Sequence, residues 1–311
     1  MHVVNEFLFV FPESQVPDRQ LSGFHGVHAA SNKHWRLIIS REFGYDTEFT
    51  PEVPPTGTKA RSTKVGMAPT LLAMPRVLRE HEHEYPAARW LHDLLTTSAV
   101  FLEPDWSALR TASPPGLPKT IVPDGRNTPW MALELKRQGA SPDSALDYRS
   151  EAYGDWIAHV QEALPQIEDI DVREREDDHH SYFVVRYRGG FSVPSAALSD
   201  GTLHILALTL LPYLDKRPAI IVTEEPENGI HPRAIEAVLQ SLSSMPESQV
   251  WVSSHSPVVL ASVELEQLVC ARLSSSGAVE VIPGKSHPRL KEWKKGIDLD
   301  LGTLFAAEVL N

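Results

Sequence analysis

The chain has 311 residues, of which 42% are hydrophobic and 23% charged, so a packed core is expected and global disorder is excluded. A net charge of −12 argues against a broadly basic nucleic-acid surface, although it leaves room for a local basic groove. The single cysteine, Cys270, excludes a disulfide framework within the chain and a zinc–cysteine cluster. No apolar run approaches the roughly 18 residues of a membrane span, and the N-terminus lacks the basic region of a signal peptide. We therefore expect a cytoplasmic protein with no membrane partner.

The first half of the chain predicts mixed elements. Residues 34–53 are expected to form two strands around a turn at Gly44. Residues 101–125 carry five prolines and are expected to form an irregular connector. Helices are expected at 1–11, at 75–98 with a break at Pro86, and as an amphipathic pair between 128 and about 162.

The second half predicts a more regular alternation of strands and helices. Two strands are expected at 167–176 and 181–193, around a polar turn. Short β-branched runs then alternate with helical segments, which is the pattern of a parallel sheet with crossover helices. A hairpin at 271–284 and a helix at 301–309 are expected to close the chain. We place a domain boundary between 1–165 and 166–311.

A small polar tip stands directly before a buried helix in "ALSDGTLHILALTLL". Ser199 is a good helix N-cap, and Gly201 allows close approach of another group to the backbone. Free N–H groups and the helix dipole both favour an anion at such a position. The stretch therefore predicts a phosphate site at the start of the helix.

Polar residues also end two neighbouring strands. "AIIVTEEP" delivers Glu224 and Glu225, and "QVWVSSHSP" delivers Ser253, Ser254 and His255. Ligands bind beyond the carboxyl ends of the strands in an open parallel sheet. Adjacent carboxylates repel each other, and they are tolerated where one holds a cation and the other serves as a base.

These three stretches and a fourth, "ENGIHP", resemble motifs of ABC-like AAA-type ATPases of the RecF/SMC/OLD (overcoming-lysogenization-defect) branch. "LSDGT" resembles the signature motif, "IIVTEEP" the Walker B strand, "ENGIHP" the D-loop and "VWVSSHSP" the histidine switch, in the order of that family. The resemblance implies an α/β, P-loop NTPase-like fold with a mainly parallel sheet, an N-terminal β-hairpin region and a helical insertion. It implies ATP and Mg²⁺ as cofactors.

The resemblance also implies a role for each residue. Glu224 would support Mg²⁺ through water, Glu225 would be the general base for the attacking water, and His255 would sense the γ-phosphate. The signature residues, which would contact a nucleotide held by a partner subunit, are Ser199, Asp200, Gly201 and Thr202. Asn228 and His231 would lie in the D-loop, at the seam of a dimer.

The sequence contains no P-loop of the form G-x-x-x-x-G-K-[ST]. "PGKSHP" at 283–288 contains Gly-Lys-Ser, but the first glycine of a P-loop would have to stand at position 279, which is valine. The stretch also directly follows the late hairpin predicted at 271–284. Because "MHVVNEFLFVF" resembles the helix that follows a P-loop, we hypothesise that the chain begins just after that motif, with the first strands and P-loop missing. As written, it would then bind ATP poorly by itself.

The function implied by the resemblance is a dimeric ATP-driven switch, in DNA maintenance or phage defence. Its partners would be a second copy or a related ATPase, and an effector protein. DNA contact through the modestly basic region from Arg36 to Lys64 stays open, although a solvated face is favoured. The alternatives are a non-catalytic subunit that lends its signature face to an intact ATPase, and a metal-dependent nuclease that uses Glu224, Glu225 and His255.

Overall fold

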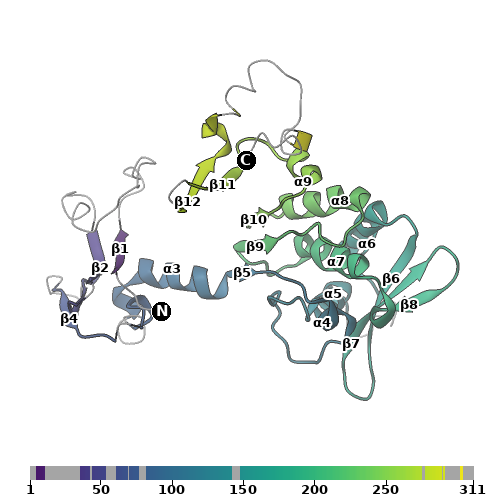
Figure 1. Cartoon of the computed structure of the whole chain (residues 1–311). Coiled ribbons are helices and arrows are strands. Elements are labelled where there is room, and N and C mark those ends of the chain that lie inside the picture. The colour runs from purple at the N-terminus through teal and green to yellow at the C-terminus, as the bar shows by residue number, and fades with distance from the viewer. Residues whose placement is uncertain are drawn as a thin grey trace. The chain divides into compact units, whose positions relative to one another are not determined.

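The computed structural model divides the chain into two compact units, Met1–Ser98 and Ala99–Asn311 (Figure 1). The predicted boundary at 165/166 lies inside the second unit, between a helix and a strand. The structure describes residues 5–10, 36–42, 44–53, 61–68, 70–76, 82–141, 148–274, 277–288, 290 and 302–303.

The first unit contains a four-stranded antiparallel sheet and a helix. The strands, in sheet order, are β1 (Asn5–Val10), β2 (Arg36–Glu42), β3 (Thr47–Phe49) and β4 (Thr63–Val65). A short 3-10 turn, η2 (Glu82–Glu84), precedes α3 (Pro86–Thr97). The predicted strand pair around Gly44 is confirmed.

Helix α3 begins at Pro86 because two features favour that start. Proline is tolerated at the first helical position, where its missing N–H group has no partner to lose. The Glu52 carboxylate accepts hydrogen bonds from Ala87 N–H at 2.8 Å and Ala88 N–H at 2.9 Å, and these two N–H groups have no acceptor within the helix. The predicted break at Pro86 therefore marks the beginning of the helix.

The helix predicted at residues 1–11 is wrong for the part that the structure describes. Residues Asn5–Val10 form β1, which pairs antiparallel with β2 over its whole length. The six residues NEFLFV are too few for a helical period to be distinguished from strand alternation. Their aromatic and β-branched side chains favour the pleated form. The likeness of this segment to a helix that follows a P-loop falls with that prediction.

The second unit contains a parallel sheet, which confirms the predicted α/β class. Its three strands, in sheet order, are β10 (Gln249–Ser253), β9 (Ile220–Glu224) and β5 (Ala99–Phe101). All three run in the same direction, and Ser253 at the end of β10 lies opposite Glu224 at the end of β9. The strand β5 was not predicted from the sequence.

Helices of the second unit gather on one side of this sheet (Figure 1). They are α4 (Trp106–Arg110), α5 (Thr128–Arg137), α6 (Glu151–Ala163), α7 (Asp200–Leu210), η4 (Leu211–Tyr213), α8 (Pro232–Ser243) and α9 (Pro257–Ala261). The pair predicted between 128 and about 162 is confirmed as α5 and α6. Within the predicted irregular connector, Asp105 caps the short helix α4 by accepting from Ser107 N–H at 2.8 Å.

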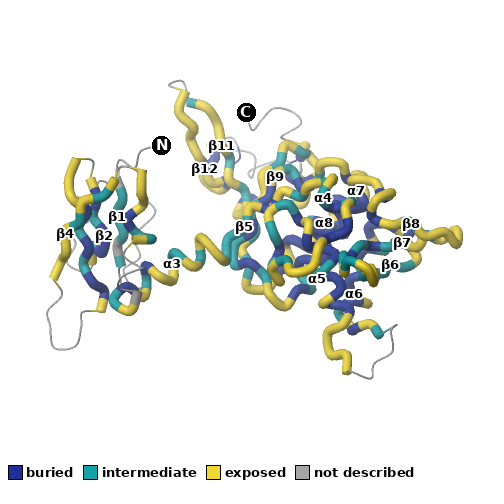
Figure 2. Tube along the Cα trace, turned by 90° about the horizontal axis from the view of Figure 1, so that it is seen from below, coloured by how far each residue is buried: buried dark blue, intermediate teal, exposed yellow. Residues whose placement is uncertain are grey.

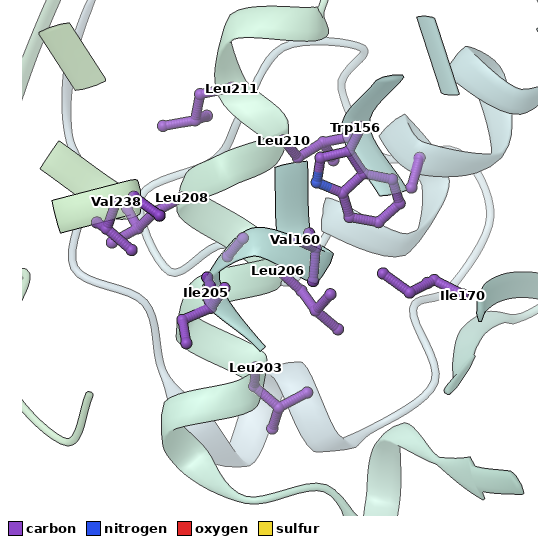
Figure 3. Packing of buried hydrophobic residues seen from close by; sticks show 14 of the residues in the cluster. Trp156, Val160, Ile170, Leu203, Ile205, Leu206, Leu208, Leu210, Leu211 and Val238 are labelled. Atoms are coloured by element: carbon purple, nitrogen blue, oxygen red, sulfur yellow. The ribbon is translucent and has the colours of Figure 1, made fainter. Parts of the chain in front are cut away.

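Helix α7 is the centre of the hydrophobic core. Its side chains are buried on every side from Thr202 to Leu210, as expected for a helix that is apolar all round. Figure 3 shows its leucines and Ile205 directed outward among Trp156 and Val160 of α6, Ile170, and Val238 of α8. The two buried polar groups at Trp156 and Thr209 satisfy each other, because Trp156 Nε1–H donates to Thr209 Oγ1 at 3.1 Å.

The other strands of the second unit are antiparallel. The sheet β6 (Ile167–Glu174), β7 (Ser181–Tyr187) and β8 (Ser192–Pro194) confirms the predicted strand pair, and η3 (Ser195–Ala197) follows it. The predicted late hairpin is β11 (Val269–Leu273) with β12 (Val279–Pro283), and it is largely exposed in Figure 2. The predicted C-terminal helix lies outside the described residues except at 302–303.

The Gly-Lys-Ser at the exit of the hairpin is a short 3-10 turn, η5 (Gly284–Ser286). A Cβ atom on Gly284 would lie 2.6 Å from the Leu265 carbonyl oxygen, and Lys285 pairs with Glu266 at 3.1 Å. The described residues of this turn are therefore packed against a backbone carbonyl and a carboxylate. Among the described residues, no helix has the length and hydropathy needed to cross a bilayer.

Candidate functional site

The predicted phosphate site is the exposed N-terminus of α7. Ser199 is the N-cap residue, with extended backbone angles, and its hydroxyl accepts a hydrogen bond from Thr202 N–H at 3.2 Å. The Ser199 and Thr202 hydroxyls also lie 2.8 Å apart. Capping therefore uses the Thr202 N–H, while the N–H groups of Asp200 and Gly201 have no acceptor within the helix.

The charge at this tip is partly neutralised by a residue that the sequence did not point to. The Arg110 guanidinium, at the end of α4, lies 2.6 Å from an Asp200 carboxylate oxygen. It also donates to the Leu198 carbonyl oxygen at 3.1 Å. Arg110 thus fixes the backbone that enters α7 and balances the carboxylate beside the helix N-terminus.

Gly201 packs against the loop that follows β9. A Cβ atom on Gly201 would lie 2.3 Å from the Gly229 carbonyl oxygen, closer than side chains tolerate. Gly229 itself has φ +75°, a conformation that glycine adopts without strain. The space at Gly201 was predicted to receive a phosphate, whereas in the structure it admits the backbone of the predicted D-loop.

The predicted Walker B carboxylates lie at the carboxyl end of the central strand β9. Glu224 is exposed, and Glu225 follows with φ +42°. A left-handed backbone at a residue other than glycine costs about 1–3 kcal/mol and persists only where surrounding contacts enforce it. One such contact is the hydrogen bond from Glu225 N–H to the Ser253 carbonyl oxygen, 2.8 Å long.

Asn228 holds the Glu225 side chain directly. Its Nδ2–H donates to Glu225 Oε2 at 2.5 Å, and its backbone N–H donates to the Glu225 carbonyl oxygen at 2.9 Å. The structure therefore brings the predicted base and a predicted D-loop residue into contact. His231 has a simpler position: it is the N-cap of α8, where its Nδ1 accepts from Arg233 N–H at 3.3 Å.

The end of β10 is tied to the same loop. Ser254 Oγ–H donates to the Glu227 carboxylate and accepts from Ser256 N–H at 3.0 Å. The other Glu227 oxygen is buried and has no hydrogen-bond partner among the described residues. His255 follows Ser254 and lies at the end of β10, as predicted. The sequence did not reveal Glu227 as the residue that links the two strand ends.

A buried histidine in α7 was also missed. His204 is 3% exposed, and its Nδ1 lies 3.1 Å from the Asn228 carbonyl oxygen. Its ring packs edge-to-face with that of Trp106, with the two ring centroids 4.2 Å apart. Burial lowers the pKa of His204 to about 4, with the Asn228 hydrogen bond opposing the shift. The signal in the sequence was a single histidine within an otherwise apolar helix.

Histidine and carboxylate side chains also gather in the polar turn after β6. Among the described residues, no group of three or more histidine, cysteine, aspartate and glutamate side chains has the geometry to hold a metal ion. In the polar turn after β6, His179 pairs with Glu174 at 2.8 Å, and His180 pairs with Asp178 at 3.1 Å. These pairs fit the polar turn expected from the sequence.

Comparison with known proteins finds a family match over the segment that carries these residues. Residues 142–261 match the family described as "AAA domain, putative AbiEii toxin, Type IV TA system". This segment of the chain is similar to that family. It extends from before α6 to the end of α9 and includes the α7 tip and both strand ends. The match agrees with the AAA-type family to which the sequence motifs point.

The solved structures that match part of this chain, each over 46% of its length, include SMC proteins. They are an Smc head domain with a coiled coil and joint from Pyrococcus yayanosii (17% identity, TM-score 0.36, 29% of that chain covered), an Smc head domain bound to the C-terminal domain of ScpA from Pyrococcus furiosus (16%, 0.36, 37%), and a structure described under ATP-driven dimerisation and DNA-stimulated activation of SMC ATPases (14%, 0.35, 91%). The chain spans less than a third of the first of these. No curated protein matches the chain.

Proposed function

We propose that the chain is an ABC-like ATPase subunit that engages ATP at the interface with a second ATPase subunit. The observation that carries the proposal is the packing of the α7 tip against the loop 225–231, through Gly201 and Gly229. Because that loop also carries Glu225, one continuous piece of the AAA domain presents both an anion-binding helix start and a carboxylate base. Such a surface suits the γ-phosphate and the attacking water of a bound nucleotide.

In this proposal the α7 tip binds the γ-phosphate of a nucleotide held by the partner. The N–H groups of Asp200 and Gly201 donate to the phosphate, and the helix dipole favours its charge. The Asp200 carboxylate would oppose an approaching anion, and its ion pair with Arg110 reduces that repulsion. Ser199 and Thr202 keep the first turn in the geometry that the contact requires.

Glu225 is the proposed general base for hydrolysis. Its carboxylate accepts the proton of the attacking water while Asn228 Nδ2–H holds one of its oxygens at 2.5 Å. Positioned bases of this kind contribute about 10²–10⁴ in rate. His255, at the end of β10, is proposed to contact the γ-phosphate, where a donor stabilises charge that develops in the transition state.

Glu224 is the proposed support for Mg²⁺, through water. Its exposed carboxylate at the end of β9 makes no hydrogen bond or ion pair with the described residues, and carboxylate oxygen is a ligand that Mg²⁺ accepts. One carboxylate acting through water suits this ion, which usually keeps several waters. When bound with ATP, Mg²⁺ neutralises charge on the β- and γ-phosphates.

The partner is proposed to be a second copy of the chain or a related ATPase, since the α7 tip faces away from its own core. Asn228 and His231, on the loop beside the tip, would lie at that interface. An effector protein, DNA contact, and a role in DNA maintenance or phage defence are proposed as the use of the switch. The family description names a toxin of a type IV toxin–antitoxin system, which is compatible with a defence role.

The competing function is a regulatory subunit that lends the same tip to a separate, intact ATPase. It is favoured by the lack of any G-x-x-x-x-G-K-[ST] stretch in these 311 residues. The two functions differ in whether Glu225 matters. A regulatory subunit would stimulate its partner's turnover through Ser199 and would be indifferent to the loss of Glu225.

The test is ATP turnover by the protein expressed from its complete reading frame. Glu225→Gln preserves size and the Asn228 contact but removes the base, so turnover is expected to fall by about 10²–10⁴. Glu236→Gln, the same change on the exposed face of α8, is the matched control and should leave turnover unchanged. Equal turnover by wild type and Glu225→Gln would refute the assigned base.

A further inference from the structure

We propose that His204 is a positioning residue that clamps the loop carrying Glu225 to helix α7. The inference rests on the proposed function for the role of Glu225. It concerns a residue to which neither the motifs nor the family match assigns a role. Its basis is the line of contacts that runs from the buried face of α7 through Asn228 to the Glu225 carboxylate.

The first contact fixes the proton on His204. Nδ1 lies 3.1 Å from the Asn228 carbonyl oxygen, which can only accept a hydrogen bond, so Nδ1 carries the hydrogen. The ring is 3% exposed and stands against Trp106, so it is held in one orientation. His204 therefore presents a fixed donor to the backbone of the loop from the core side.

The second contact passes that constraint to the base. Asn228, whose carbonyl His204 binds, uses its own side chain to hold Glu225 Oε2 at 2.5 Å. The neighbouring Gly229 carbonyl fits into the space left by Gly201. The loop is thus fastened to α7 at two successive residues, and the second of these residues lies beside the proposed phosphate-binding tip.

Glu225 needs such a constraint because its backbone is in the left-handed region, at φ +42°. A residue other than glycine leaves this region unless neighbouring contacts hold it there. The bond to Ser253 holds its N–H, and Asn228 holds its carbonyl and carboxylate. Releasing Asn228 from His204 would loosen two of these three contacts at once.

The experiment compares two amide substitutions that differ in where they place a donor. In His204→Asn the amide nitrogen takes the place of Nδ1, and in His204→Gln it takes the place of Nε2. Both side chains are neutral and polar, so loss of packing against Trp106 affects both. The measurements are hydrogen–deuterium exchange of the Glu225, Asn228 and Ile230 amides, and kcat and KM for ATP.

We expect His204→Gln to speed exchange of those loop amides about tenfold, the factor that one net hydrogen bond is worth, with the α8 amides unchanged. Its kcat should fall about ten- to a hundredfold at constant KM, because the base is misplaced while nucleotide binding persists. His204→Asn should restore both towards wild type. Equal behaviour of the two variants, whether both resemble wild type or both lose protection, would overturn the proposal.

Two measurements keep the test independent of its assumptions. If wild type shows no ATP turnover but the exchange pattern is as expected, the proposed function fails and the clamp stands. If both variants fail to fold, nitrogen NMR of wild-type His204 decides: a protonated Nδ1 with a coupling to the Asn228 carbonyl supports the clamp. A protonated Nε2 alone would refute it.

Discussion

Substituting Gly201 by alanine perturbs the contact on which the proposed site depends. The new Cβ atom would lie 2.3 Å from the Gly229 carbonyl oxygen and 3.3 Å from its carbonyl carbon. Both neighbours are backbone atoms, so no flexible side chain can move aside. Either α7 or the loop 225–231 must shift by at least about 0.7 Å to reach 3.0 Å, the shortest separation that such contacts show.

The cost follows from what resists that shift. Helix α7 is buried on all sides from Thr202 onward, so it has little freedom to move. The loop is held by the His204 and Asn228 hydrogen bonds. Overpacking of this kind costs about 1–3 kcal/mol, and the better helix propensity of alanine returns up to about 1 kcal/mol. We expect a net loss of about 1–2 kcal/mol in the free energy of unfolding.

The assay is urea unfolding followed by far-UV circular dichroism, with Gly154→Ala as the matched control. Gly154 lies in α6 and is exposed, and a methyl group added there would have no neighbouring atom within 4 Å. The same chemical change there should stabilise the protein by about 0.5–1 kcal/mol. The two variants should therefore shift the midpoint in opposite directions at an unchanged denaturant slope.

Two results would refute this reasoning. If Gly201→Ala is as stable as Gly154→Ala, the loop does not approach α7 as closely as the structure has it. If Gly201→Ala is destabilised but the loop amides of Asn228 and Ile230 keep their protection from exchange, the strain is relieved elsewhere. In either case the link between the α7 tip and Glu225 would lose its structural basis.

Three further predictions concern stability. Burial depresses the pKa of His204 from 6.5 to about 4, so the unfolded chain binds the proton at a higher pH than the folded chain does. The free energy of unfolding should therefore fall by about 3 kcal/mol as the pH is lowered from 6.5 to 4. Urea unfolding at several pH values should show this pH dependence, and it should be smaller in His204→Asn. Ser199→Ala removes the hydroxyl that caps α7 and should lower the free energy of unfolding in urea by about 1 kcal/mol, whereas Ser199→Thr should lower it little. Equal losses in the two variants would contradict the capping role. Lys136→Met removes the Lys136 ammonium group that lies 2.7 Å from the half-buried Asp171 carboxylate, and it should lower the free energy of unfolding by about 2 kcal/mol, measured by thermal unfolding. The double variant Lys136→Met with Asp171→Leu should recover most of that loss. A single substitution with no effect on stability would refute the pairing.

The parts of the fold that the sequence predicted well have strong local signals. Helix α7 is apolar at nearly every position after its polar cap, and β9 and β10 are short β-branched runs that end in charged or polar residues. Each pattern is complete within about ten residues. The parallel direction of the two strands then follows from the helix between them, because a crossover connection returns the chain to the same edge.

Elements without a local signal were missed or misassigned. The apolar run Phe7–Val10 of β1 suits either a helix or a strand, and pairing with β2 decides the outcome. The three residues of β5 have no period at all, and only their place beside β9 makes them a strand. In both cases the deciding hydrogen bonds come from residues distant in the sequence.

The candidate site shows the same division. Glu224, Glu225 and His255 were predicted as site residues because they follow the apolar runs of two strands, a pattern that a sequence reveals. Arg110 and His204 were not found, because their partners lie 88 and 24 residues away and depend on how α4, α7 and the loop pack. The residues that hold a site in place are harder to recognise than those that would do its chemistry, since their types are not specific.

The most direct test of the central claim is the molar mass of the Glu225→Gln protein, expressed from its complete reading frame, by sedimentation with and without Mg-ATP. The account predicts a stable ATP-dependent complex of two ATPase subunits, because the nucleotide is bound between them and is not hydrolysed. Adding Ser199→Arg, which places a bulky side chain at the α7 tip, should abolish that complex. A mass that is the same with and without ATP, or a complex that survives Ser199→Arg, would contradict the claim.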